Sequence, residues 1–327
     1  MQPSRRPRSR RRRYRYRLRR LTPVAVAVVL AGGAGAWFGS HQPSASLAAA
    51  SRGPLVEAKA AAPVRHTARP ERLLTVTSLL AHRFSPALLA SSAILVDEDT
   101  GRVLWEQNAH ERRPVASTTK IMTALLALRK LAPHDIVTVD PSVPRVPLVR
   151  EGLRAGERVQ AWKLFYSMLL YSGNDDALAL AIAAGGDKWT FVHEMNAEAQ
   201  LLGLHDTHFV SPSGVVDRGN YSSAWDLAAL TRVALRNPRF AKIVRTKVEH
   251  VSWSAPTYAK IYVNNNRMLT EYPGANGVKT GYTHKSGPCL VVTAKRGGHT
   301  LLAVVLNSPN MYSDATRLLN LGFSALR

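Results

Sequence analysis

The order of apolar and polar residues predicts a domain of alternating strands and helices from about residue 85 onward. Short apolar runs between glycine and polar residues indicate a hairpin turning at residues 97–101 and several strands within residues 247–307. Apolar residues at helical spacing predict helices over residues 117–130, 161–171, 175–184, 188–203, 224–235 and 314–323. This succession predicts an α/β fold: an antiparallel sheet flanked by helices, with a mostly helical lobe beside it and the site in the cleft between them.

The first 84 residues follow three other patterns. Residues 1–20 contain 11 Arg and neither Asp nor Glu, and residues 21–38 form an apolar run of 18 residues interrupted only by Thr22 and Pro23. Residues 39–84 are rich in Ala, Ser, Pro and Arg, with little periodicity. We therefore expect a basic cytoplasmic tail, a membrane segment and a flexible linker before a domain of residues 85–327.

The apolar segment can be a retained anchor or a signal peptide. Basic residues before an apolar run keep the N-terminus in the cytoplasm, so the domain is expected on the outer side. The run is long for a signal-peptide core and at the short limit for a spanning helix. Because the candidate cleavage sequence Ala48-Ala49-Ala50 lies well beyond it, we expect a single-pass anchor at the cell membrane.

Composition agrees with an exported enzyme. With 327 residues and 46% hydrophobic content, the chain can bury a sizeable core. Half of the net charge of +22 lies in the first 20 residues, and this basic block leads directly into the apolar run, so no nucleic-acid partner is expected. The single cysteine, Cys289, opens the apolar run 289–292 and is expected in the core.

Three short motifs carry the candidate chemistry: S-T-T-K at residues 117–120, S-G-N at 172–174 and K-T-G at 279–281. Taken singly, they can be a helix start, an interhelical turn and a hairpin strand. In this order, S-x-x-K, S-x-N and K-T-G are typical of penicillin-binding proteins and class A β-lactamases, in which the serine attacks a carbonyl.

The first motif pairs a nucleophile with a base. A serine hydroxyl needs an adjacent base at neutral pH, and Lys120 is the nearest candidate to Ser117. One helical turn separates them, so both are expected on one helix face. Lys120 must be partly uncharged, and both burial and the cation of Lys279 would lower its pKa.

The other motif residues have expected roles around this pair. Ser172 would lie between the two lysines and pass protons, and Asn174 would hold a substrate amide. Lys279 and Thr280 would bind the terminal carboxylate of the substrate, and Gly281 would leave room for its backbone. The oxyanion hole would come from the backbone N–H groups of Ser117 and Tyr282.

The chain resembles the D-alanyl-D-alanine carboxypeptidase family of low-molecular-mass penicillin-binding proteins. The resemblance runs through SAILVDEDTGRVLWEQNAHERRPVASTTKIMTALLAL, EGLRAGERVQAWKLFYSMLLYSGNDDALALA, FVHEMNAEAQLLGLHDTHFVSPSGVVD and YPGANGVKTGYTHKSGPCLVVTAKRGGHTLLAVVLNSP. It implies a β-lactamase/transpeptidase-like fold, removal of the terminal D-alanine from peptidoglycan stem peptides through an acyl-enzyme, and inhibition by β-lactams, with no cofactor. Some relatives carry a cation at the position aligned with Asn265, and the sequence leaves open whether Arg267 replaces it.

Three other functions are considered. A zinc peptidase would need a ligand set, and the tight cluster His205, Asp206 and His208 has no H-E-x-x-H companion. A β-lactamase would need a glutamate that activates the deacylating water, whereas the neighbourhood of Glu194 and Glu198 resembles a helix of the carboxypeptidase family. A catalytically idle cell-wall peptide-binding protein would not need every reactive side chain.

Overall fold

The computed structural model describes residues 73–76, 86–147, 149–215, 219–255 and 257–326. The expected tail (1–20), the expected anchor (21–38) and nearly all of the expected linker (39–84) lie outside these residues. No helix in the described part combines the length and apolar character needed to cross a bilayer.

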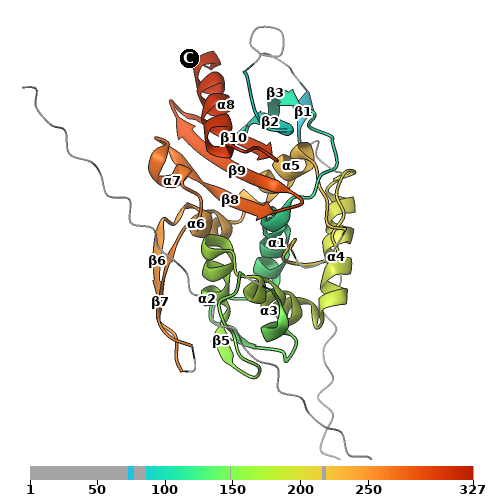
Figure 1. Ribbon diagram of the computed structural model, residues 1–327, viewed down its shortest axis with the longest axis vertical. Coiled ribbons are helices and arrows are strands. Elements are labelled where there is room, and N and C mark those ends of the chain that lie inside the picture. Colours follow the sequence, from blue (N-terminus) through green and yellow to red (C-terminus); the bar gives the residue numbers. More distant parts are fainter. Residues whose placement is uncertain (1–72, 77–85, 148, 216–218, 256, 327) are drawn as a thin grey trace, which may run out of the picture. The chain divides into compact units, whose positions relative to one another are not determined.

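A six-stranded sheet forms the centre of the domain, in the order β1-β3-β2-β10-β9-β8 (Figure 1). Neighbouring strands are antiparallel, except that β1 runs parallel to β3. Strand β8 lies at one edge of the sheet. The strands are β1 (Thr75–Val76), β2 (Ser92–Asp97), β3 (Arg102–Gln107), β8 (Ala275–Thr283), β9 (Gly287–Arg296) and β10 (His299–Leu306).

Alternate residues of the strands bury the two faces of this sheet in two separate cores. On β2, Ile94 and Val96 belong to one core and Leu95 to the other, as the two-residue period of a strand requires. The C-terminal helix α8 (Met311–Ala325) packs on the Leu95 face. Helices α1 (Lys120–Lys130) and α5 (Ala224–Leu235) belong to the core on the other face.

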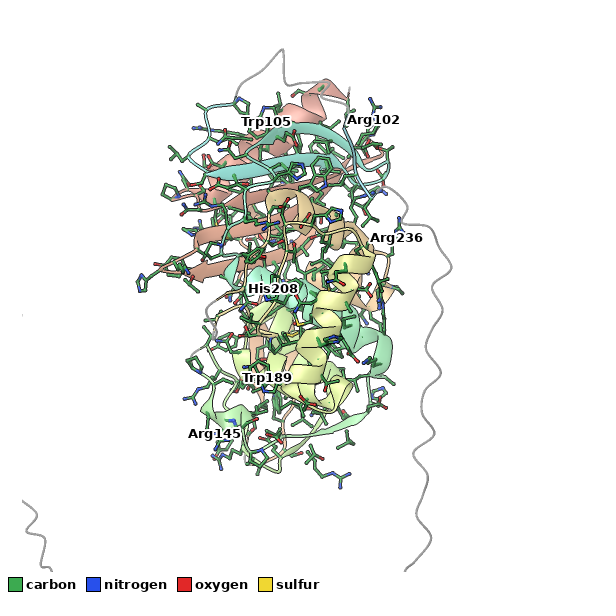
Figure 2. All side chains as sticks on the ribbon, turned by 90° about the vertical axis from the view of Figure 1, so that its right-hand side faces the viewer. Arg102, Trp105, Arg145, Trp189, His208 and Arg236 are labelled. Carbon is green, nitrogen blue, oxygen red and sulfur yellow. The ribbon has the colours of Figure 1, made fainter. Side chains whose placement is uncertain are left out.

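A mostly helical lobe extends from this second face (Figure 1). Turned by 90°, the molecule shows α4 on its near side, with Trp189 close to the beginning of the helix and His208 beside it (Figure 2). Two small antiparallel ribbons, β4–β5 and β6–β7, complete the lobe. Its elements are α2 (Ala161–Tyr166), α3 (Asn174–Gly185), α4 (Lys188–Leu201), α6 (Pro238–Arg245), β4 (Ile136–Thr138), β5 (Arg158–Gln160), β6 (Val248–Val251) and β7 (Lys260–Val263). The short helix α7 (Met268–Glu271) belongs to the other face of the sheet, where Met268 shares the core of α8.

The predicted α/β architecture is confirmed, with local differences. The helix expected from residue 117 begins at Lys120, because residues 116–119 form a tighter 3-10 turn, η1 (Ala116–Thr119). The helix expected over 161–171 becomes α2 followed by a π-helical turn, Ser167–Tyr171. Helix α6, which begins with Asn237 accepting backbone N–H groups and Pro238 at its first position, was not predicted.

Candidate active site

Ser117 lies in the turn that leads into α1. Ala116 has φ +48°, a left-handed conformation that is strained by about 1–3 kcal/mol for a residue with a side chain. The turn is closed by Thr118, whose hydroxyl donates to the carbonyl of Val115 at 2.7 Å. A strained, buried turn at the nucleophile fixes the direction in which the Ser117 hydroxyl points.

Helix α1 holds Lys120 directly beneath this serine. The predicted pairing is confirmed, since the Lys120 Nζ lies 2.8 Å from the Ser117 Oγ. The helix is buried on every side from Lys120 to Leu128, so water has no access to the amine. Lys120 itself is fully buried.

Two further oxygen atoms surround the Lys120 amine. The side-chain oxygen of Asn174 lies at 2.8 Å and the backbone carbonyl oxygen of Ser213 at 3.1 Å. The S-x-x-K and S-x-N motifs therefore meet at one nitrogen atom. Asn174 also donates its Nδ2 to the carbonyl of Pro147 at 3.2 Å, so its amide is oriented from both ends.

The environment of Lys120 favours its uncharged form. Burial and the nearby Lys279 both lower the pKa of Lys120 well below its usual value, against an opposing effect of Asp176 and Asp175. Burial also lowers the pKa of Lys279 to about 7. The expected influence of Lys279 on Lys120 is thus present, with desolvation as the larger cause.

The K-T-G motif occupies the edge strand β8. Lys279 is buried there and donates to the carbonyl of Thr280 at 3.1 Å. A Cβ at Gly281 would lie 2.9 Å from the Val115 carbonyl and 3.1 Å from the Ser117 nitrogen. The glycine therefore lets the strand pass directly against the nucleophile turn, a reason different from the expected room for substrate.

Tyr282 follows this close approach. Its side chain is 60% exposed and contacts His284, with 3.4 Å between Oη and Nδ1. Its backbone pairs with Pro288 of β9, which has no N–H to donate. Tyr282 directly follows Gly281, the residue at which β8 passes against the nucleophile turn. The oxyanion hole formed with the Ser117 N–H is expected at this place.

Ser172 ends the π-helical turn in a left-handed conformation, with φ +77°. Its side chain is nearly buried, but within the described residues its hydroxyl makes no hydrogen bond to Lys120 or Lys279. Its position between the two lysines therefore stays a prediction.

The loop at residues 211–214 was missed as part of the site. Ser213 contributes only a backbone carbonyl, which no residue type reveals. Gly214 is the part of this loop that the sequence could have indicated, because only a glycine fits there. It has φ +74°, and a Cβ on it would lie 2.0 Å from the Ala116 carbonyl oxygen. A side chain there would push the loop off the nucleophile turn.

The glutamates weighed for a β-lactamase have other partners. Glu198 accepts from Arg129 at 2.9 Å, and Glu194 pairs with Lys130 at 2.5 Å. Both arginine and lysine lie in the last turn of α1, so the glutamates hold α4 against the end of the helix remote from Ser117.

The other candidate residues also have structural partners. Asp206 accepts from Arg112 at 3.1 Å and lies 3.3 Å from the ring of His110, and His208 contacts the ring of Tyr221. Arg267 pairs with Glu271 at 2.7 Å. The thiol of Cys289 is buried, and burial raises its pKa to about 11, which fits the expected core position.

Comparisons with known proteins point to a single family. The chain matches the family described as D-alanyl-D-alanine carboxypeptidase over residues 81–310. It is 35% identical over 257 residues to D-alanyl-D-alanine carboxypeptidase DacF of Bacillus subtilis (strain 168), covering 76% of this chain and 64%, just under two thirds, of that protein. It is 35% identical over 262 residues to the D-alanyl-D-alanine carboxypeptidase of Streptomyces sp. (strain K15), covering 73% of this chain and 89% of that protein.

The fold has solved counterparts. The crystal structure of the Streptomyces K15 DD-transpeptidase is 33% identical, with a TM-score of 0.69, and the match covers 74% of this chain and 99% of that one. The family match, supported by the fold, defines a serine peptidase. The chain belongs to the D-alanyl-D-alanine carboxypeptidase family.

Proposed function

We propose that this chain removes the terminal D-alanine from peptidoglycan stem peptides through an acyl-enzyme on Ser117. The Ser117 Oγ attacks the carbonyl of the penultimate D-alanine while its proton passes to the Lys120 Nζ. The C–N bond then breaks, and the leaving D-alanine amine takes up a proton through Ser172. Water hydrolyses the resulting ester and regenerates Ser117.

The hydrogen bonds of Lys120 carry this proposal. An uncharged amine has two N–H groups and one lone pair. The Asn174 Oδ1 and the Ser213 carbonyl can only accept, so they take both N–H groups. In this form the lone pair is left for the third partner, the Ser117 hydroxyl at 2.8 Å, which then donates. A charged lysine would instead donate to all three oxygens, so the lowered pKa of Lys120, caused by burial and by Lys279, is what favours the neutral base.

The edge strand β8 supplies the proposed substrate contacts. A stem peptide extended along its free edge would bring the scissile carbonyl to the N–H groups of Ser117 and Tyr282. Lys279 and Thr280 would bind the terminal carboxylate, Gly281 keeps the strand against the nucleophile turn, and Asn174 would hold a substrate amide. Carboxylate binding would favour a charged Lys279, which burial alone disfavours.

Two measurements test the assignment. The soluble domain should release D-alanine from a D-alanyl-D-alanine peptide in the presence of chelator, and penicillin should add once to the protein. Ser117→Ala should lose both, whereas Ser142→Ala, a matched change outside the site, should keep both. An adduct on Cys289 or Tyr282, or loss of activity with chelator, would contradict the proposal.

The acceptor of the acyl group is a separate question. One relative is named a carboxypeptidase and a solved neighbour a DD-transpeptidase. We propose water as the acceptor here. Product analysis with added glycine as a competing amine checks this, because a dominant glycine adduct would make the chain a transpeptidase.

A β-lactamase is disfavoured by the partners of the two helix glutamates. Since Glu194 and Glu198 are held by cations at the far end of α1, neither is placed to activate a deacylating water. Hydrolysed penicillin should therefore leave much more slowly than D-alanine is released. Fast penicillin turnover without peptide cleavage would favour a β-lactamase over a carboxypeptidase.

We further propose that residues 21–38 anchor the enzyme in the cell membrane, with the domain outside. The support is the block of 11 Arg before an apolar run of 18 residues. A linker of 46 residues would let the domain reach roughly 35–40 Å from the bilayer. The N-terminus of the mature protein tests this: a start near Ser51 in a soluble fraction would make the segment a signal peptide.

A further inference from the structure

A buried chain of polar groups lies behind the S-G-N motif, and the proposed reaction makes no use of it. The Tyr262 hydroxyl donates to the Glu151 Oε2 at 2.6 Å. The Ser167 Oγ lies 3.0 Å from the same Glu151 oxygen and 2.5 Å from the Asp176 Oδ2. We call Tyr262, Glu151, Ser167 and Asp176 the carboxyl chain; it links strand β7 to the beginning of α3.

The position of the carboxyl chain relates it to the base. Asp176 follows Asn174 by two residues, and a Cβ on Gly173 would lie 1.8 Å from the Asp176 Oδ2. The carboxyl group is therefore packed directly under the turn that carries Ser172 and Asn174. A negative charge here favours the protonated form of Lys120, which is the wrong form for the proposed base.

Counting hydrogen atoms locates a proton in the carboxyl chain. Ser167 has one hydroxyl hydrogen and two carboxyl neighbours, so one neighbour must donate to it if both contacts are hydrogen bonds. Glu151 already receives the Tyr262 hydroxyl and is paired with the ammonium of Lys260, which suits a carboxylate. Asp176 is then the donor.

The remaining oxygen of Asp176 agrees with this count. Its Oδ1 is buried and has no hydrogen-bond partner among the described residues. An unpartnered carbonyl oxygen of a neutral acid is less costly to bury than an unpartnered carboxylate oxygen. Burial and the neighbours Asp175 and Glu151 raise the pKa of Asp176 well above its usual value, in the same direction.

Asp175 is bound in the opposite way. Its two oxygens accept the backbone N–H groups of Glu151 and Gly152, both at 2.8 Å. Three N–H groups of residues 151–153 point at this carboxylate, which stabilises its charge. The two adjacent aspartates thus have opposite surroundings: Asp175 accepts three backbone N–H groups, whereas the Asp176 Oδ1 has no hydrogen-bond partner among the described residues.

We propose that the carboxyl chain keeps Asp176 protonated, and that this neutral acid allows Lys120 to remain an uncharged base. Glu151, Tyr262 and Asp176 are then positioning residues, which act on the reaction through Lys120. The inference rests on the proposed function. The charged groups that bear on Lys120 are Lys279, Asp175 and Asp176, and those that bear on Asp176 are Asp175, Glu151 and Lys260.

The test is the pH dependence of single-turnover acylation by penicillin. In Glu151→Gln, Asp176 loses a repelling neighbour, and Lys260 loses its carboxylate partner and attracts Asp176 instead. Asp176 then ionises and raises the pKa of Lys120, so the acidic limb of the pH–rate profile should move up by about one pH unit. Asp176→Asn should leave the limb within about 0.3 units of wild type, and the double variant should restore it. A purely structural role predicts no such restoration.

A milder variant guards against misfolding. Tyr262→Phe removes one donor to Glu151 and should move the limb upward by less, while Tyr272→Phe, which removes a partly buried hydrogen bond to Asn320 outside the carboxyl chain, should not move it. A downward move of about one unit in Asp176→Asn, or a double variant that keeps the Glu151→Gln shift, would overturn the proposal.

A measurement without turnover tests the protonation of Asp176 separately from acylation of Ser117. The infrared spectrum of the wild-type protein at neutral pH should contain a neutral carboxylic acid band that Asp176→Asn removes. If that band is absent while penicillin still acylates Ser117, the inference is wrong and the proposed function stands. If the band is present without any acylation, the proposed function is wrong.

Discussion

The contact between β8 and the nucleophile turn gives a prediction whose size follows from distances. In Gly281→Ala the new Cβ would lie 2.9 Å from the Val115 carbonyl oxygen and 3.1 Å from the Ser117 nitrogen. Both neighbours are backbone atoms, which cannot rotate aside. Ordinary van der Waals contact requires the strand and the turn to separate by about 0.5 Å.

This separation acts on the proposed oxyanion hole, because one N–H would come from the turn and the other from the strand. Loss of one such donor lowers kcat by about 10²–10³-fold, and a displacement of 1 Å can cost about 10²-fold. An opening of about half that size should lower the acylation rate by about 10–100-fold. Overpacking should also reduce the free energy of unfolding by about 1–3 kcal/mol.

Stopped-flow acylation with a chromogenic β-lactam measures the rate, and urea denaturation measures the stability. Gly322→Ala on α8 is the matched control, because its Cβ would lie 2.6 Å from a terminal carbon of Leu301, within the core on the α8 face of the sheet. That variant should lose stability and keep its acylation rate. Wild-type acylation by Gly281→Ala would refute the claim that the strand–turn spacing sets the rate.

Three further predictions concern Lys279 and Glu198. In Lys279→Ala the acidic limb of acylation should move to higher pH, because Lys120 would hold its proton more tightly; an unchanged profile in single-turnover kinetics would remove Lys279 from the control of that pKa. Since the pKa of Lys279 is lowered from 10.5 to about 7, the unfolded chain binds more protons between these values, and stability should rise with pH across them. Chemical denaturation of Lys279→Met should show that up to about 5 kcal/mol of this rise in the free energy of unfolding is lost. Equal dependence of the free energy of unfolding on pH in the two proteins would contradict the claim that burial lowers the pKa of Lys279. Glu198→Gln should lower stability by about 1 kcal/mol and leave the release of hydrolysed penicillin unchanged, whereas slower release would assign Glu198 to deacylation.

The side chains of the candidate site could be predicted from the sequence. The order of the three motifs predicts Ser117, Lys120 and Lys279 as site residues, because acyl transfer needs a nucleophile, a base and a cation of those residue types. The structure confirms the contact between Ser117 and Lys120. Helical spacing was sufficient for this, even though the serine lies in a 3-10 turn, since three residues still return the chain to the same side.

Backbone contributions were not predictable in this way. The carbonyl of Ser213 binds Lys120, and every residue type has such a carbonyl. The left-handed conformation of Ala116 gives no sequence signal either, because alanine does not favour it. The carboxyl chain joins Glu151 to Tyr262 across 111 residues, and only the folded structure brings them together. Functions of the backbone and of long-range contacts therefore depend on the fold.

Burial is the common cause of the chemistry at this site and of its cost to stability. Lys120 and Lys279 are both buried, and burial disfavours the charged form of each. A buried amine is tolerated when it is neutral and its hydrogens are bonded, which is the state that Asn174 and Ser213 provide for Lys120. The same state leaves its lone pair facing the nucleophile. The arrangement that makes the buried lysine tolerable in the fold is thus the arrangement that the proposed reaction requires, and any change that returns water or negative charge to Lys120 should act on activity before it unfolds the domain.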